Sequence, residues 1–412
     1  MKTKIDLDCF FDGTLGYDLR SVEKYKKNLD KCQEASEKLI LEIKEKSNEA
    51  INSFSFEYQN KIKLQKNIAA EKRNKLVIGL GGSSAGAKAI SAYLEKGINF
   101  FDNYDLRYLK IFFNTNNLKD FLIYVVSKSG NTFETMAILN LTYQHLAKIS
   151  GVEEMRKNII IITEDSDNLL NSFAKKNSFQ VIAYNKKIGG RYSVFSEACM
   201  ALFDFDSRKV SISTESVILK LTEKNLEDQS NPTVNAAVIL TMQKTNNIKF
   251  NINLLYDYSL KNYSYWFHQL FAESLGKNNN AITPMTSICP KDHHSMMQLF
   301  IDGPKDKLFN IYPPSENKFF ESFSSLNLGD IEKKSPENLL QSQYLGLVQT
   351  FKNRKIPHRI IKCSSDPANR ESNILELFAY NILETIILAY AQNINPYDQP
   401  AVDQIKKNTF RT

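Results

Sequence analysis

Cysteine, histidine and tryptophan are scarce in this chain of 412 residues, which has five cysteines, five histidines and one tryptophan. No two cysteines stand close enough for a zinc or thiol–disulfide motif. An odd, sparse set is typical of free thiols in a reducing compartment. We therefore expect neither a disulfide framework nor a metal site. The cysteines are Cys9, Cys32, Cys199, Cys289 and Cys363.

Long apolar runs and basic blocks are also absent from the sequence. No run approaches the roughly 20 apolar residues that a membrane helix needs. The opening "MKTKIDLDCFFDG" has acidic residues where an export signal is apolar. The net charge of +7 is dispersed, and no lysine–arginine block is interleaved with aromatic residues. We expect a cytoplasmic protein that binds neither membrane nor nucleic acid, and whose mild positive charge suits a small anionic substrate.

The length predicts two domains, because 412 residues exceed one ordinary core. Residues 15–75 are polar, with apolar positions every three to four residues, which predicts amphipathic helix. We expect a surface helix packed on a later domain; a coiled-coil partner helix is the alternative. The segment "FDGTL" mimics a phosphatase nucleophile loop, but Phe10 stands where that chemistry needs an aspartate, so we expect an N-terminal turn.

Short apolar runs then alternate with helical patterns, which predicts an α/β fold. Runs such as 159–162 lack polar alternation, as strands of a parallel sheet do when both faces are buried. We expect two doubly wound parallel-sheet domains, with an N-terminal helical segment and a C-terminal helix. The boundaries are 1–54 for the helical segment, 55–205 and 206–390 for the domains, and 391–412 for the tail. The predicted strands are 75–80, 108–113, 121–126, 158–163, 179–184, 248–256, 308–313 and 358–363.

The glycine-rich segment "GLGGSSAG", residues 79–86, follows a strand and opens a helix. A dinucleotide site would need glycine at Ser84 and an acid after the next strand, and a phosphate-binding P-loop would need lysine at Ala87. Both interpretations fail. We expect backbone N–H groups and the Ser83 hydroxyl to approach an anionic or polar ligand; a tight packing turn is the alternative.

Hydroxyl groups cluster in "VVSKSGNTFET", residues 125–135, between a strand and a helix. The spacing of Asn131 and Glu134 predicts a variant of the capping box. Ligands bind at this edge of open α/β sheets. The hydroxyls of Ser127, Ser129 and Thr132 at a positive helix end suit a phosphomonoester. A loop that only caps the helix is the alternative.

Two further segments carry charged side chains. In "GGRYSVFSEACMALFDF", Arg191 follows two glycines and can stabilise a developing oxyanion. In "WFHQLFAESLGK", Gln269 and Glu273 share one helix face, and the carboxylate is a candidate general base. A solvated surface position is the alternative for each charge.

The remaining candidates lie near the C-terminus. His293 and His294 lack a spaced third ligand, so one neutral histidine in acid–base catalysis is more plausible than a metal site. Gln399 and Lys406 stand seven apart, two helical turns, so both can face one pocket; an exposed lysine is the alternative.

Six segments in this order resemble the glucose-6-phosphate isomerase family of the sugar isomerase (SIS-domain) superfamily. They span residues 79–406: "GLGGSSAG", "SKSGNTFET", "GGRYSVFSE", "ESLGK", "DHHSMMQL" and "DQPAVDQIK". The resemblance implies interconversion of glucose 6-phosphate and fructose 6-phosphate through an enediolate, without metal or organic cofactor, in a homodimer. It implies a phosphate site and a sugar site, formed by Ser127, Lys128, Ser129 and Thr132 and by Gly82 and Ser83. It implies catalytic roles for Glu273 as base, Arg191 at the enediolate and His294 and Lys406 in ring opening, with supporting contacts from Gln269 and Gln399.

The sequence departs from the family at two of these positions. Ser129 stands where threonine is common, and His293 where glutamine is common, so the choice of His294 depends on the "S..QL" that follows it. Two alternatives remain: an isomerase that also accepts mannose 6-phosphate, and a non-catalytic regulator that binds a sugar phosphate. A regulator would not need Glu273, His294 and Lys406, and all three are present.

Overall fold

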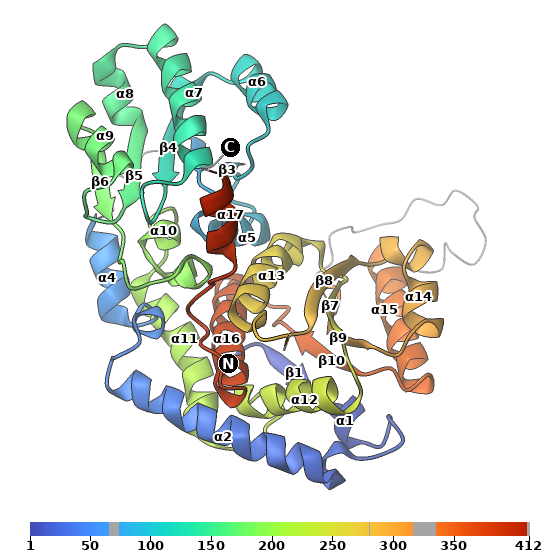
Figure 1. Ribbon diagram of the computed structural model, residues 1–412. Helices are drawn as coiled ribbons and strands as arrows, with labels where there is room; N and C mark the ends of the chain where they lie inside the picture. The colour runs from blue at the N-terminus through green and yellow to red at the C-terminus, as the bar shows by residue number, and fades with distance from the viewer. Residues whose placement is uncertain (66–73, 280, 316–334, 410–412) are drawn as a thin grey trace, which may run out of the picture. The chain divides into compact units, whose positions relative to one another are not determined.

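The computed structural model describes residues 1–65, 74–279, 281–315 and 335–409 (Figure 1). The chain forms two compact units, which we call the central unit, Lys46–Ile212, and the terminal unit, Met1–Glu45 with Ser213–Thr412. Each contains a mainly parallel sheet covered by helices, so the predicted α/β class is confirmed. The predicted four-part division stays a prediction, and the first 54 residues are shared between the two units.

The central unit contains a five-stranded parallel sheet in the order β3-β2-β4-β5-β6. Every residue of β4 and β5 is buried, as their unbroken apolar sequences predict. The strands are β2 (Asn74–Ile78), β3 (Asn99–Phe101), β4 (Phe121–Val126), β5 (Ile159–Thr163) and β6 (Gln180–Ala183). The helices are α3 (Glu49–Asn52), α4 (Phe56–Gln65), α5 (Ala85–Tyr93), α6 (Leu106–Thr115), α7 (Phe133–Ile149), α8 (Val152–Asn158), α9 (Leu169–Asn177) and α10 (Glu197–Met200).

The strand predicted over 108–113 is wrong, because these residues form α6. The Asp105 side chain caps this helix by accepting from the backbone N–H groups of Arg107 and Tyr108. Leu109 and Phe112, three residues apart, are buried on one face. The apolar residues of 108–113 therefore serve one helix face, and the edge strand is β3, which was not predicted.

The helix predicted over 193–205 is also wrong in extent. Residues Gly190–Phe195 form a 3₁₀ helix, η4, and only Glu197–Met200 are α-helical, as α10. The Ser196 side chain separates the two by accepting from the Ala198 N–H. Serine competes with the helix for backbone donors in this way, which explains the break.

The terminal unit contains a second five-stranded sheet in the order β1-β10-β9-β7-β8. Four strands are parallel, and the edge strand β1 is antiparallel to β10. The strands are β1 (Lys4–Asp6), β7 (Phe250–Leu255), β8 (Thr283–Ile288), β9 (Lys307–Tyr312) and β10 (His358–Lys362). The helices are α1 (Asp8–Phe11), α2 (Glu23–Lys44), α12 (Pro232–Thr245), α13 (Lys261–Leu275), α14 (Met297–Asp302), α15 (Pro336–Asn353), α16 (Arg370–Ala391) and α17 (Val402–Thr409), while α11 (Ser207–Thr222) spans the boundary between the units.

Two edge strands and one helix of this unit were not predicted. β1 has only three residues, and β8 is mostly half-buried, so neither shows a continuous apolar run. β8 contains Pro284, which an edge strand tolerates. The buried helix α12 shows no one-sided apolar face because residues all round it are buried.

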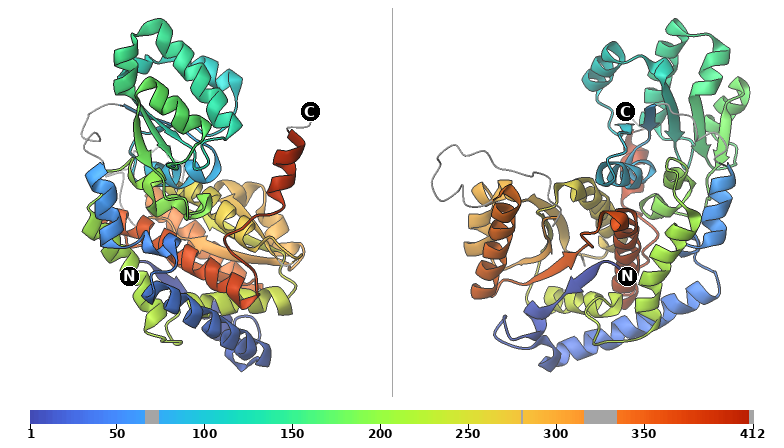
Figure 2. Two further views of the ribbon diagram at one scale, coloured as in Figure 1. Left: turned by 60° about the vertical axis from the view of Figure 1, so that its left-hand side comes forward. Right: turned by 180° about the vertical axis from the view of Figure 1, so that it is seen from behind.

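The two faces of the terminal sheet differ in chemistry. One face packs against α14 and α15 through an apolar cluster that includes Leu254, Phe309, Phe300 and Phe351 (Figures 1 and 2). The other face carries asparagine side chains from β7 and β9 together with Arg359 from β10. Alternation along each strand sends neighbouring residues to opposite faces, which separates the two sets.

The N-terminal helix α2 packs against α12 and α16, so the prediction of a surface helix packed on a later domain is confirmed. The predicted turn at "FDGTL" is also observed, because α1 ends at Phe11 and Gly13 adopts a positive φ of 83°. Within the described part of the chain, one helical segment, Pro367–Ala391, is long and apolar enough to cross a membrane, and 89% of its apolar window is buried inside the protein. It is therefore a core helix of this unit.

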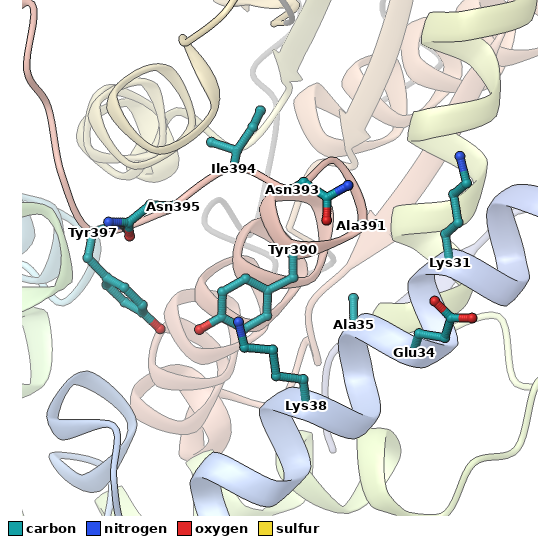
Figure 3. A pocket seen from close by; sticks show the side chains of 10 residues that line it. All are labelled: Lys31, Glu34, Ala35, Lys38, Tyr390, Ala391, Asn393, Ile394, Asn395 and Tyr397. Carbon is teal, nitrogen blue, oxygen red and sulfur yellow. Dashed lines mark hydrogen bonds between the residues drawn. The ribbon is translucent and has the colours of Figure 1, made fainter.

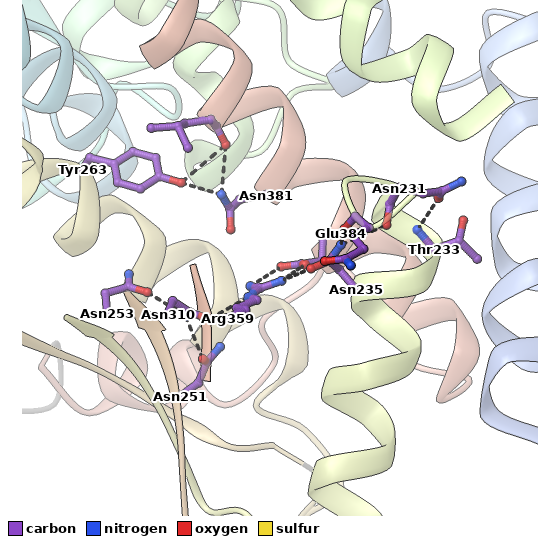
Figure 4. A network of polar contacts seen from close by, with 12 residues as sticks. Asn231, Thr233, Asn235, Asn251, Asn253, Tyr263, Asn310, Arg359, Asn381 and Glu384 are labelled. Atoms are coloured by element: carbon purple, nitrogen blue, oxygen red, sulfur yellow. Dashed lines mark hydrogen bonds and ion pairs between the residues drawn. The ribbon is translucent and has the colours of Figure 1, made fainter. Parts of the chain in front are cut away.

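A buried ion pair joins β10 to α16 (Figure 4). Arg359 donates to both carboxylate oxygens of Glu384, and its Nη1 also donates to Asn235 Oδ1 on α12 at 2.9 Å. The side chains of the pair are 1% and 0% exposed. Neither charge is solvated by water, so each depends on the other.

We expect Glu384→Gln to lower the free energy of unfolding by about 3–5 kcal/mol, because it leaves a buried guanidinium without a countercharge. Denaturant unfolding measures the change. The matched control is Glu23→Gln, which removes an exposed pair with Lys27 and should change stability little. Equal effects of the two substitutions would contradict the buried pair's role.

Candidate active site

The loops after β2 and β4 lie side by side in the central unit. The two strands are adjacent and parallel, with Ile78 paired to Val125, and Gly79 lies against Val126. The chain passes from β2 to β3 on one side and then to β4 on the other. This reversal is the topological switch point, where ligands bind in open α/β sheets.

The loop after β2 requires glycine because another backbone touches it. A Cβ atom on Gly82 would lie 2.1 Å from the carbonyl carbon of Gly190, and the Gly82 carbonyl accepts from Ser193 Oγ at 2.8 Å. Ser83 is half-buried in the 3₁₀ turn Gly81–Ser83. The "GLGGSSAG" and "GGRYS" segments, about 110 residues apart in the chain, therefore meet backbone to backbone.

The loop after β4 holds hydroxyl groups at the start of α7. The Ser127 and Thr132 hydroxyl oxygens are 3.0 Å apart, and Ser127 is 1% exposed. Thr132 is the N-cap of α7, and its side chain makes no capping bond. The predicted capping box with Asn131 is wrong, because the Asn131 side chain accepts from the Leu169 N–H at 3.1 Å.

Lys128 and Ser129 lie in the same loop and are more accessible. Lys128 Nζ lies 3.9 Å from Glu164 Oε1, and burial lowers the pKa of its ammonium despite that carboxylate. Ser129 is exposed, and its Oγ accepts from the Asn131 N–H at 3.3 Å. The loop therefore combines two paired hydroxyls, a further hydroxyl and a half-buried cation, which are donors suited to a phosphate.

Arg191 lies on η4 and is 2% exposed. Its guanidinium carbon is 5.3 Å from the centroid of the Tyr192 ring. The alternative of a solvated surface arginine is therefore wrong. Because η4 contacts the Gly81–Ser83 turn, Arg191 belongs to the same edge of the central sheet.

Glu273 and Gln269 lie one turn apart on α13 in the terminal unit. Gln269 Nε2 donates to Glu273 Oε1 at 3.1 Å, so the predicted shared face is confirmed. Both side chains are half-buried. The neighbouring amide therefore orients the carboxylate that is the candidate base.

The two adjacent histidines differ in their surroundings. His293 Nε2 hydrogen-bonds the Tyr256 hydroxyl at 2.7 Å, and burial lowers the pKa of its imidazole. His294 is exposed. His293 therefore serves the packing of this turn, and His294 is the more accessible histidine.

Gln399 and Lys406 do not share a helix, so that prediction is wrong. α17 begins at Val402, and Gln399 lies in the preceding turn, where its carbonyl accepts from the Val402 N–H at 3.2 Å. Gln399 is exposed, and Lys406 is on α17 with its side chain outside the described part of the structure. Pro400 follows Gln399, and a residue before proline disfavours the helical backbone, which explains the late start of the helix.

A lysine that the sequence patterns did not single out binds the residues before α17. Lys277, just after α13, donates to the Asn395 carbonyl and pairs with Asp398 at 2.6 Å. Its side chain is largely buried, at 13% exposed. The pair ties the residues before α17 to the end of the helix that carries Glu273. Its position in the "ESLGK" segment is the feature from which the sequence could have identified it.

A separate pocket of about 630 Å³ lies in the terminal unit between α2 and the end of α16 (Figure 3). The Lys38 ammonium is 3.9 Å from the centroid of the Tyr390 ring there. None of the predicted site residues lines it. Among the described residues, no group of three or more His, Cys, Asp or Glu side chains is placed to hold a metal ion.

Comparisons with known proteins agree with the resemblance noted in the sequence. A family model described as "Phosphoglucose isomerase" matches residues 46–289. A glucose-6-phosphate isomerase of Methanocaldococcus jannaschii is 30% identical over 346 residues, covering 82% of this chain and 84% of the relative. One of Acholeplasma laidlawii is 28% identical over 358 residues, covering 82% of each.

Solved structures share the fold. A hypothetical protein of Thermus thermophilus superposes with a TM-score of 0.82 at 22% identity, covering 99% of both chains. A glucose-6-phosphate isomerase of Chlamydia trachomatis superposes with a TM-score of 0.71 at 18% identity, covering 86% of this chain and 72% of its own.

We expect Gly82→Ala to destabilise the central unit, because the new methyl group would overlap the Gly190 backbone. Thermal unfolding should show a lower Tm, and activity should fall with it. Gly151→Ala is the control, since a Cβ atom there meets nothing within 4 Å. A Tm for Gly82→Ala equal to that of the control would show that the two loops do not touch.

Proposed function

We propose how this chain, which belongs to the phosphoglucose isomerase family, converts glucose 6-phosphate and fructose 6-phosphate into each other. This reaction moves a proton between C2 and C1 of the open-chain sugar through an enediolate and belongs to glycolysis. The proposal assigns a role to each candidate residue. The observation that carries it is the Gln269–Glu273 hydrogen bond, which presents an oriented carboxylate on α13.

Glu273 is the general base in this mechanism. It takes the proton from one carbon and returns it to the other, which one carboxylate can do if it keeps its position. A hydrogen bond from Gln269 restricts its rotation. Arg191 stabilises the negative charge of the enediolate, and its burial supports this role because charges interact more strongly away from water.

The phosphate is bound by Ser127, Lys128, Ser129 and Thr132. The paired hydroxyls and the N-terminus of the 17-residue helix α7 support this assignment. Gly82 and Ser83 contact the sugar by backbone and hydroxyl groups, which the close approach of two backbones at Gly82 supports.

Ring opening requires an acid and a base that serve the ring oxygen and the anomeric hydroxyl. We assign it to His294 and Lys406, with Gln399 as a supporting contact. The exposure of His294 leaves its imidazole accessible to a substrate, whereas His293 is bound to Tyr256. We propose that the chain acts in the cytoplasm as a homodimer. Light scattering of the purified protein tests the dimer.

We expect Glu273→Gln to retain sugar-phosphate binding but to lower kcat by about 10²–10⁴-fold, the usual contribution of a positioned base. A coupled assay from fructose 6-phosphate, with chelator present, measures kcat, and calorimetry measures binding. Glu23→Gln, a surface substitution on α2, is the control and should keep wild-type activity. Near wild-type kcat in Glu273→Gln would remove Glu273 from the mechanism. The same assay with mannose 6-phosphate tests for a second substrate.

We expect Ser127→Ala and Thr132→Val each to raise the KM for fructose 6-phosphate by roughly tenfold or more, since each removes a hydrogen bond to a charged group. The kcat should change less, because the base is untouched. Thr115→Val on α6 is the control, as its hydroxyl bonds only neighbouring groups at the end of α6, the Ile111 and Phe112 carbonyls and the Asn116 side chain. An unchanged KM in both variants would place the phosphate elsewhere.

A further inference from the structure

A chain of buried hydrogen bonds crosses the polar face of the terminal sheet. It begins at Arg359, whose Nε donates to Asn310 Oδ1 at 2.7 Å (Figure 4). Asn310 Nδ2 donates to Asn253 Oδ1 at 2.8 Å, and Asn253 Nδ2 donates to Ser264 Oγ at 2.9 Å. All four residues are buried. This series of hydrogen bonds thus connects β10 through β9 and β7 to the helix α13.

The series of hydrogen bonds continues from Ser264 to the His268 imidazole on the same helix. Ser264 Oγ lies 2.6 Å from Thr286 Oγ1 on β8, and Thr286 Oγ1 lies 2.9 Å from His268 Nε2. His268 also hydrogen-bonds the backbone of Met285. Two residues one turn apart on α13 therefore contact the same threonine hydroxyl.

The guanidinium determines the direction of the first three bonds. A guanidinium has only donors, so Asn310 must accept with its oxygen and donate with its nitrogen. The same holds for Asn253, so Ser264 accepts and its hydroxyl proton is free to point at Thr286. The last two bonds take their direction from the imidazole: a neutral ring carries one proton, and the bond to the Met285 backbone uses it, so Nε2 accepts from Thr286. This proton lies on Nδ1, where it reaches the Met285 carbonyl.

Burial supports this neutral state. It lowers the pKa of the His268 imidazole below its ordinary value of 6.5, although the bond to the Met285 backbone acts in the opposite direction. The neighbouring Tyr265 ring packs edge-on at 5.6 Å and brings no charge. A proton added to Nε2 would turn the Thr286 hydroxyl away and break the ordered sequence of donors.

We propose that His268 and Thr286 are positioning residues for the isomerase reaction, which hold α13 on the sheet so that the Gln269–Glu273 pair keeps its orientation. The inference rests on the proposed role of Glu273. Ser264 and His268, one turn apart on α13, both hydrogen-bond the Thr286 hydroxyl, and these two contacts prevent the helix from rotating about its axis. Gln269 directly follows His268, so such a rotation would displace the carboxylate through its hydrogen-bond partner.

The test compares Thr286→Val with Thr286→Ser. Valine keeps the shape of threonine and removes the hydroxyl, whereas serine keeps the hydroxyl. We expect Thr286→Val to lower kcat by roughly 10- to 100-fold, as small displacements of catalytic groups do, with KM within about twofold of wild type. Thr286→Ser should restore most of kcat. Equal, wild-type kcat in both variants would overturn the proposal.

A second pair of variants covers the case in which Thr286→Val does not fold. His268→Gln retains one donor and one acceptor, whereas His268→Leu retains neither. We expect His268→Gln to keep more kcat than His268→Leu at equal Tm. The matched control is His145→Gln in the central unit, where the imidazole stacks on Phe113 at 5.0 Å and should not affect kcat. Equal kcat in the two His268 variants would contradict the proposal.

Nitrogen-15 spectra of histidine-labelled protein provide a readout independent of activity. The His268 signals are those absent from His268→Gln. We expect an unprotonated Nε2 and a protonated Nδ1 in the wild type, and a mixture of tautomers in Thr286→Val. A protonated Nε2 in the wild type would overturn the inference. Wild-type activity of Glu273→Gln would instead refute the proposed role of Glu273 as the base, so the two failures are distinguishable.

Discussion

The buried ion pair of Arg359 and Glu384 constrains four elements of the terminal unit, because Arg359 on β10 bonds side chains on α16, α12 and β9. Both groups are out of reach of water, so the fold must bring β10 and α16 together before either charge can be buried. The remaining donors of the guanidinium then require that Asn235 and Asn310 face it with their amide oxygens rather than their nitrogens. One permanently charged side chain thus orders hydrogen bonds on three other elements.

This arrangement explains why one face of a parallel sheet in this protein is polar. Strands buried on both faces usually carry continuous apolar runs, yet β7 alternates asparagine with isoleucine and leucine. The apolar set packs against α14 and α15, and the asparagines hydrogen-bond one another and Arg359 on the opposite face. A connected polar network of this kind favours one packing of helices, because another packing would leave more buried groups unpaired.

The central unit positions its candidate residues by a different constraint, which is steric. The Gly190 backbone approaches Gly82 so closely that Gly82 has no room for a side chain. The contact brings η4, and with it Arg191, to the sheet edge where the loops after β2 and β4 lie side by side. The hydroxyl pair of Ser127 and Thr132 lies at this same edge because β4 ends there and α7 begins.

The errors of prediction have a common cause. An apolar run such as 108–113 can serve a strand or one face of a helix, and only the Asp105 cap and the packing of Leu109 and Phe112 decide between them. Asn131 has the spacing of a cap but bonds to Leu169, which is distant in sequence. Gln399 has helical spacing to Lys406 but precedes the helix. Local spacing is compatible with several structures, and contacts distant in sequence select one.

The sequence by itself determined the α/β class, the strands β2, β4, β5, β6, β7, β9 and β10, and the segments that identify the family. These depend on buried apolar runs and on side-chain chemistry, which are properties of local sequence. Only the tertiary structure decided that Gly82 meets Gly190, that His293 rather than His294 is bound to Tyr256, and that His268 ends a chain begun by Arg359. Each of these depends on strand order and helix packing, which bring together residues that no short-range pattern connects.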